Sequence, residues 1–161
     1  MSDTTTAPAA ADAATQAALE RLNTVIDRLI APDGCPWDST QTPESLTEYV
    51  IEECHELVDA IRSGKTADMV EELGDVAFLI LLIGKLMARA GGPSLADALE
   101  VEAAKMVRRH PHVFSDTTYE SQSEQLKDWD RIKREEKAAA DAEGPKGTYD
   151  SLPRGLPPLT K

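Results

Sequence analysis

The chain has 161 residues, of which 41% are hydrophobic and 29% are charged, a composition typical of a globular domain. Its formal net charge of −12 argues against a protein that binds nucleic acid through overall positive charge. The longest apolar run, 76–84, is far shorter than the roughly 20 residues that a membrane-spanning helix needs. Two cysteines cannot form a disulfide framework. We therefore expect a cytoplasmic protein whose partners are neither nucleic acids nor membranes.

Helical periodicity dominates, and we predict an all-α fold of four or five helices within one domain over 16–142. Residues 1–15, rich in Ala and Thr, are expected to form a disordered lead-in. The first helix is predicted over 15–30, before Pro32-Asp33-Gly34 ends it. Its apolar residues recur at intervals of three or four: Leu19, Leu22, Val25, Ile26 and Leu29.

The second helix is predicted to begin at Thr42 and to end near Ile61. Thr42 suits the N-cap, and Pro43 suits the first helical position because its missing N–H costs nothing there. The predicted core face of this helix comprises Leu46, Val50, Cys54, Leu57 and Ile61.

Three more helices and a tail complete the prediction. The third helix, over 67–90, is apolar nearly all round after Asp75, which indicates burial in the core or against a second subunit. Ser94 is the predicted N-cap of a fourth helix that ends near Arg109. A fifth helix is predicted over 119–142, followed by a Pro-rich tail over 143–161.

Acidic residues concentrate between residues 43 and 75, where ten carboxylates are opposed by two basic side chains. A solvated acidic face is the simplest interpretation of such a run. Here, however, the acids border strongly apolar faces and recur at matched spacing on consecutive helices. Gly74 also lies in mid-helix, where Gly costs about 1 kcal/mol relative to Ala, so we expect another helix to approach closely there.

The spacing of these acids predicts a metal site. Glu53 and Glu56 are three residues apart on the second predicted helix, and Glu72 and Asp75 repeat that spacing on the third. A short turn makes the two helices an antiparallel hairpin, so the four carboxylates can face one another across a groove. Without cations they would repel, and hard divalent cations with oxygen ligands, Mg²⁺ by default, relieve this repulsion.

Two histidine patterns offer weaker alternatives. Glu52-Glu53-Cys54-His55 contains one Glu-x-x-His, whereas di-iron bundles use two. His110-Pro111-His112 could suggest a pair of metal ligands, but the intervening proline breaks helical spacing. We expect it to be a structural loop.

Basic residues gather later in the chain. Lys105 and Arg109 lie four residues apart on one helix face, and Lys133 follows Trp129 by four residues on the last predicted helix. Two interpretations stay open: the cations pair with surface acids, or they form a clamp for phosphate oxygens. The acids nearest to Lys105 and Arg109 in sequence are only partly within reach, so we expect these two side chains to point toward a polyphosphate substrate.

Several motifs carry a family resemblance. They are Gly34-Cys35-Pro36-Trp37-Asp38, Glu52-Glu53-x-x-Glu56, Glu72-Leu73-Gly74-Asp75, Arg109-His110-Pro111-His112-Val113-Phe114 and Trp129-x-x-x-Lys133-Arg134. With them the sequence resembles the MazG family of nucleoside triphosphate pyrophosphohydrolases, over roughly residues 19–159. It is most similar to the first domain of members that carry two such domains in tandem.

The resemblance implies a MazG-like helical bundle, completed by dimerisation, that hydrolyses nucleoside triphosphates to monophosphates and pyrophosphate and so cleans the nucleotide pool. It implies a homodimer or higher homo-oligomer that uses Mg²⁺, with Mn²⁺ as a substitute. Two alternatives are a narrower dUTP or dCTP pyrophosphatase and a non-catalytic nucleotide-binding dimerisation module. The implied metal ligands are Glu53, Glu56, Glu72 and Asp75. Glu52 is implied to be either a carboxylate that supports these ligands or the base that orients the attacking water. The implied substrate-binding residues are Lys105, Arg109, Trp129 and Lys133.

Overall fold

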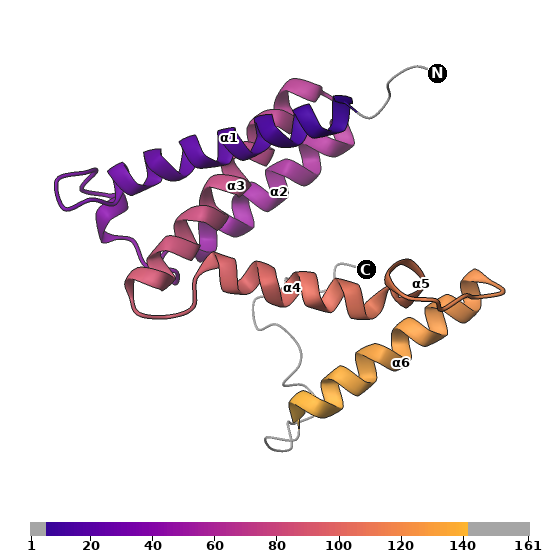
Figure 1. The fold of residues 1–161 in the computed structure, drawn as a ribbon. Coiled ribbons are helices and arrows are strands. Elements are labelled where there is room, and N and C mark those ends of the chain that lie inside the picture. The colour runs from indigo at the N-terminus through magenta and orange to yellow at the C-terminus, as the bar shows by residue number, and fades with distance from the viewer. Residues whose placement is uncertain (1–5, 142–161) are drawn as a thin grey trace, which may run out of the picture. The chain divides into compact units, whose positions relative to one another are not determined.

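The computed structural model describes residues 6–141, and every regular element among them is helical (Figure 1), which confirms the all-α prediction. These residues divide into two compact units between Leu99 and Glu100. The elements are α1 (Thr6–Leu29), a short 3₁₀ helix η1 (Asp38–Thr40), α2 (Thr47–Ser63), α3 (Thr66–Arg89), α4 (Leu95–Arg109), α5 (Pro111–Phe114) and α6 (Gln122–Asp141). The boundaries predicted for the functional domain, 16–142, stay a prediction, and the tail over 143–161 lies outside the described residues.

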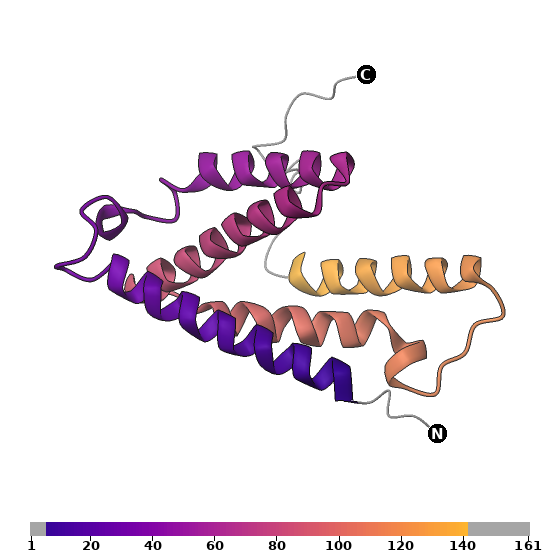
Figure 2. The same ribbon diagram turned by 90° about the horizontal axis from the view of Figure 1, so that it is seen from above.

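The first unit is built on an antiparallel hairpin of α2 and α3, against which α1 packs (Figures 1 and 2). Gly64 ends α2 with φ = +70°, a left-handed conformation that suits glycine, and two residues join the helices. The third predicted helix, 67–90, matches α3 to within one residue at each end. Buried apolar side chains from α1, from α3 and from the turn before α2 form one core: Ile26, Leu46, Leu79, Leu82 and Leu86.

The helix starts differ from the predictions at α1 and α2. The disordered lead-in expected over 1–15 is wrong from Thr6 onward, because the alanine-rich segment that follows is helical. α2 begins at Thr47 rather than next to Pro43. Thr42 does act as a cap, since its Oγ1 accepts a hydrogen bond from the Ser45 N–H, but the resulting turn ends before the helix starts.

The buried side of α2 is also rotated relative to the prediction. Cys54 and Ile61 are exposed, whereas Ala60 is buried and Glu53 is half-buried. The prediction assigned the buried face of α2 to apolar residues alone, but the acidic Glu53 occupies the middle of the helix face that packs toward α3. Consequently, part of the apolar surface of α2 remains uncovered by the chain's own described residues.

The N-cap predicted for α4 is confirmed. Ser94 and Asp97 form a reciprocal capping pair, in which the Ser94 N–H donates to Asp97 Oδ2 at 2.7 Å and the Asp97 N–H donates to Ser94 Oγ at 3.3 Å. The Ser94 hydroxyl also donates to Asp97 Oδ2, at 2.6 Å, and this hydrogen bond, followed by that from the Ser94 N–H, lowers the pKa of Asp97. Just before this cap, α3 approaches closely, and a Cβ on Gly84 would lie 2.7 Å from the Cβ of Leu95.

In the second unit, His110-Pro111-His112 is not a loop as expected, because the short helix α5 begins at Pro111 and includes His112. The last helix, predicted from Tyr119, begins at Gln122 as α6. The Tyr119 hydroxyl donates a hydrogen bond to Asp128 Oδ2 at 2.7 Å, which ties the preceding segment to that helix. Among residues 6–141, no helix is long and apolar enough to cross a membrane.

Candidate functional site

Three carboxylates converge across the hairpin of the first unit. Glu53 and Glu56 lie one turn apart on α2, and Glu72 lies on α3. Each offers one oxygen, and these oxygens all lie within 4.8 Å of one another. This convergence confirms that the predicted spacing brings acids from both helices together.

The donor set fits a hard divalent cation. An ion bound at about 2.1 Å (Mg²⁺) to about 2.5 Å (Ca²⁺) separates opposite oxygen ligands by roughly 4–5 Å, so a spread of 4.8 Å suits one shared ion. Within the described residues, no Lys or Arg forms an ion pair with Glu53, Glu56 or Glu72. The cluster therefore lacks a protein counter-charge in that part of the chain.

Burial and neighbouring negative charges raise the pKa values of two of these carboxylates. Partial burial raises the pKa of Glu53, and the negative charges of Asp75, Glu56 and Glu52 raise it further. The pKa of Glu72 is raised in the same way, first by desolvation and then by neighbouring carboxylates, of which Glu56 contributes most. Both shifts indicate a site that favours neutralisation by protons or by cations.

The two remaining acids of the predicted site lie at its edge. Asp75 falls outside the three-carboxylate group, but its charge has the largest electrostatic effect on Glu53. Glu52 is exposed and also raises the pKa of Glu53. Both residues therefore lie close enough to the cluster for their charges to act on Glu53.

A surface hollow of about 410 Å³ adjoins the cluster and is lined partly by Glu56 and Glu72. Asp59 and Asp68 also line this hollow, although neither was among the predicted site residues. Each lies near the end of its helix and has a basic neighbour, with Arg62 3.7 Å from Asp59 and Lys65 3.4 Å from Asp68. Their helical spacing from Glu56 and Glu72, three and four residues, could have identified them.

Two other expectations for this unit are not supported by the described residues. His55 is exposed and does not belong to the group of three converging carboxylates, so the di-iron alternative has no histidine ligand there. A Cβ on Gly74 would meet no atom within 4 Å. The close helix approach expected at Gly74 is therefore not made by these residues of the chain.

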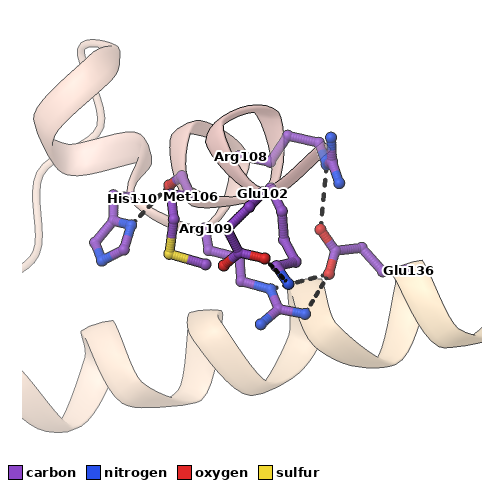
Figure 3. Close-up of polar contacts among 7 residues, drawn as sticks. Glu102, Met106, Arg108, Arg109, His110 and Glu136 are labelled. Atoms are coloured by element: carbon purple, nitrogen blue, oxygen red, sulfur yellow. Dashed lines mark hydrogen bonds and ion pairs between the residues drawn. The ribbon is translucent and has the colours of Figure 1, made fainter. Parts of the chain in front are cut away.

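The predicted substrate-binding cations belong to the second unit, where Lys105 and Arg109 are paired with carboxylates. Lys105 forms an ion pair with Glu102. Arg109 donates from Nε and Nη2 to Glu136 Oε2, at 2.9 and 2.7 Å (Figure 3). The expectation that the acids nearest in sequence are only partly within reach was wrong for Lys105, because Glu102 lies one helical turn away and pairs with it. Arg109 instead pairs with Glu136, an acid 27 residues away in sequence that the prediction did not consider.

The aromatic residue expected in the substrate site packs beside this pair. The Arg109 guanidinium lies 5.8 Å from the centre of the half-buried Trp129 ring. The His110 ring meets Trp129 edge to face at 4.8 Å, and its Nδ1–H donates to the Met106 carbonyl. Lys133 is exposed and helps to line a shallow hollow of about 350 Å³ on α6.

Comparison with known proteins gives a consistent result. Residues 41–114 match the profile of the MazG nucleotide pyrophosphohydrolase domain. The chain is 42% identical to the protein YabN of Bacillus subtilis over 137 residues, which cover 85% of this chain and 27% of that protein. It is 37% identical to the nucleoside triphosphate pyrophosphohydrolase of Escherichia coli K12 over 144 residues, 89% of this chain and 54% of the relative.

A solved structure extends the likeness to the fold. The crystal structure of a MazG-related protein from Thermotoga maritima superposes with a TM-score of 0.61 at 30% identity, over 71% of this chain and 98% of that one. The chain thus spans nearly all of this structural relative, but about half or less of the length of the two sequence relatives.

Proposed function

Because the chain belongs to the MazG family, we propose that it hydrolyses nucleoside triphosphates to nucleoside monophosphates and pyrophosphate at the cluster of Glu53, Glu56 and Glu72. The observation that carries the proposal is the convergence of three acids from two helices without a basic partner in the described residues. The name of the E. coli relative, a nucleoside triphosphate pyrophosphohydrolase, supports the reaction type. The proposed role is the removal of unwanted triphosphates from the cytoplasmic nucleotide pool.

We assign the carboxylates of Glu53, Glu56, Glu72 and Asp75 to the binding of Mg²⁺, which Mn²⁺ can replace. The ion, when bound, supplies positive charge that offsets the phosphate oxygens and activates water. Glu52, exposed next to this cluster, orients the water that attacks the α-phosphorus and accepts its proton.

On the substrate side, we assign phosphate binding to Lys105 and Arg109, and closure of the nucleotide site to Trp129 and Lys133. Guanidinium and ammonium groups suit phosphate oxygens because their hydrogen bonds are charge-assisted. The Arg109 guanidinium also lies over the Trp129 ring, 5.8 Å from its centre, a position suited to a cation–π interaction.

We also propose that the chain works as a homodimer formed through the hairpin of α2 and α3. Large apolar side chains on these two helices are exposed, among them Ile51, Val58, Leu73 and Ile80, which are 40–59% exposed. A second copy of the chain would cover them, and the open space at Gly74 would admit its backbone.

The proposal is tested by incubating the full chain with Mg²⁺ and a panel of standard and modified nucleoside triphosphates, followed by chromatography of the products. We expect monophosphate and pyrophosphate, and neither diphosphate nor orthophosphate. Turnover confined to dUTP or dCTP would indicate a narrower pyrophosphatase. Tight binding of nucleotide without product above background would refute catalysis and indicate a nucleotide-binding module.

A further inference from the structure

One carboxylate in the second unit holds two neighbouring arginines. Glu136 on α6 accepts a hydrogen bond from Arg108 Nε at Oε1, at 3.1 Å, and two from Arg109 at Oε2 (Figure 3). Consecutive residues on a helix point about 100° apart, so Arg108 and Arg109 would diverge without a shared partner. The side chains of Arg109 and Glu136 are 19% and 22% exposed, whereas that of Arg108 is 56% exposed.

We propose that Glu136 is a positioning residue that gathers Arg108 and Arg109 into one pair for binding phosphate oxygens. This inference rests on the proposed function, in which Arg109 alone of these three residues binds substrate. It adds Arg108 as a second phosphate-binding residue and gives Glu136 a role that acts through both arginines.

The atoms used by Glu136 leave the arginines able to bind an anion. Glu136 takes the Nε–H of both guanidinium groups and one N–H of Arg109 Nη2. Within residues 6–141, Nη1 of Arg109 and both terminal nitrogens of Arg108 form no hydrogen bond. These outer N–H groups can donate to phosphate oxygens while Glu136 stays in place, so binding does not require the pair to break.

Whether loss of the Glu136 carboxylate weakens or strengthens polyanion binding distinguishes a positioning role from a purely electrostatic or competing one. Removal of a carboxylate near a polyanion site strengthens binding if only long-range charge matters, or if the carboxylate competes with the ligand. A positioning role predicts the opposite, because the freed guanidinium groups lose their fixed orientation and must be ordered when the ligand binds.

The test measures the affinity of the full chain for inorganic tripolyphosphate in the presence of Mg²⁺ by calorimetry, so that no turnover is needed. We expect Glu136→Gln to weaken binding roughly tenfold, near the lower end for loss of a charge-assisted hydrogen bond. The matched control is Glu135→Gln, which removes the same charge one residue away and breaks the pair with Arg131 instead. This control should change the affinity less than about twofold, since exposed pairs are screened.

Arg108→Gln provides a second, independent measurement, because it leaves the pair of Arg109 with Glu136 intact and does not depend on the folding of the Glu136 variant. It should weaken tripolyphosphate binding about fivefold relative to Arg131→Gln, a matched loss of positive charge on α6. In a chain with both Arg108→Gln and Arg109→Gln, the further change Glu136→Gln should have no effect on affinity.

Two results would overturn the inference: binding by Glu136→Gln that equals or exceeds that of Glu135→Gln, or equal binding by Arg108→Gln and Arg131→Gln. A wild-type chain that does not bind tripolyphosphate would overturn it as well. Failure of the proposed function is distinguishable, since it would appear as an absence of pyrophosphate release from nucleoside triphosphates, whatever the tripolyphosphate affinities show.

Discussion

A carboxylate oxygen of Glu53 on α2 lies within 4.8 Å of one of Glu72 on α3. The two residues are 19 positions apart in sequence, and the connection formed by Gly64 and Lys65 reverses the chain so that their helices lie side by side in a hairpin. Partial burial and mutual repulsion raise the pKa of both groups. The proximity of the two carboxylates is thus unfavourable in the metal-free protein, and a cation bound between them would make it favourable.

Removal of one negative charge at the cluster should stop catalysis without unfolding the protein. We expect Glu53→Gln, Glu56→Gln, Glu72→Gln and Asp75→Asn each to lower pyrophosphate release more than a hundredfold, about 2.7 kcal/mol or more, because the amides keep the shape but lose the charge that holds the ion. Circular dichroism should show unchanged helix content.

The matched control for these variants is Glu48→Gln, an exposed carboxylate on the first turn of α2 that is outside the cluster. It should retain nearly wild-type turnover. If two of the four cluster variants also retain it, the site assignment is wrong.

Divalent cations should stabilise the wild-type chain. A ligand that binds the folded state at 100 times its dissociation constant adds about 2.7 kcal/mol, so Mg²⁺ should raise Tm in a concentration-dependent manner. Glu72→Gln should raise the Tm of the metal-free protein by relieving repulsion, and should largely abolish the response to Mg²⁺. A variant that responds to Mg²⁺ as the wild type does would contradict this prediction.

The pH dependence of metal-free stability follows from the raised pKa values of Glu53 and Glu72. Above their ordinary value of 4.5 and up to the raised values, these groups hold more protons in the folded state than in the unfolded state. Their contribution therefore favours folding at the acidic end of this window and is lost as pH rises through it. Denaturation of wild type and Glu72→Gln at several pH values should show a smaller loss of stability for the variant.

The paired cations should matter for substrate use. Lys105→Ala and Arg109→Ala should each lower kcat/KM roughly 10- to 150-fold, the equivalent of a lost charge-assisted hydrogen bond of about 1.5–3 kcal/mol. The control is Lys65→Ala, an exposed lysine of the hairpin turn paired with Asp68. Equal catalytic efficiency in all three variants would identify Lys105 and Arg109 as surface charges.

The exposed apolar face of the hairpin should be required for association. Leu73, which is 59% exposed, is expected to lie in the dimer interface, so Leu73→Asp should shift the protein from dimer to monomer. The control is Val113→Asp, a similarly exposed apolar residue of α5. Light scattering coupled to gel filtration measures both masses. A wild-type monomer at micromolar concentration, or a dimeric Leu73→Asp variant, would refute this interface.

The sequence predicts local features well and long-range partners poorly. Ser94 caps α4 as predicted, because capping depends on residues only three positions apart. The acidic cluster was also predictable, since one short turn determines which faces of two helices meet. The pairing of Arg109 with Glu136 was not, because it depends on how the segment after Arg109 brings α6 to α4. Hydrophobicity also failed at Cys54 and Ile61, whose exposed apolar surface belongs to no core formed by the described residues.

We propose that this chain directs water to the α-phosphorus of a nucleoside triphosphate at the cluster of Glu53, Glu56 and Glu72. Hydrolysis in oxygen-18 water with Mg²⁺, followed by mass spectrometry of the products, tests it most directly. The account predicts one labelled oxygen in the monophosphate and none in the pyrophosphate, with product formation lost in Glu72→Gln. Label found in pyrophosphate or orthophosphate, or turnover that persists in Glu72→Gln, would contradict it.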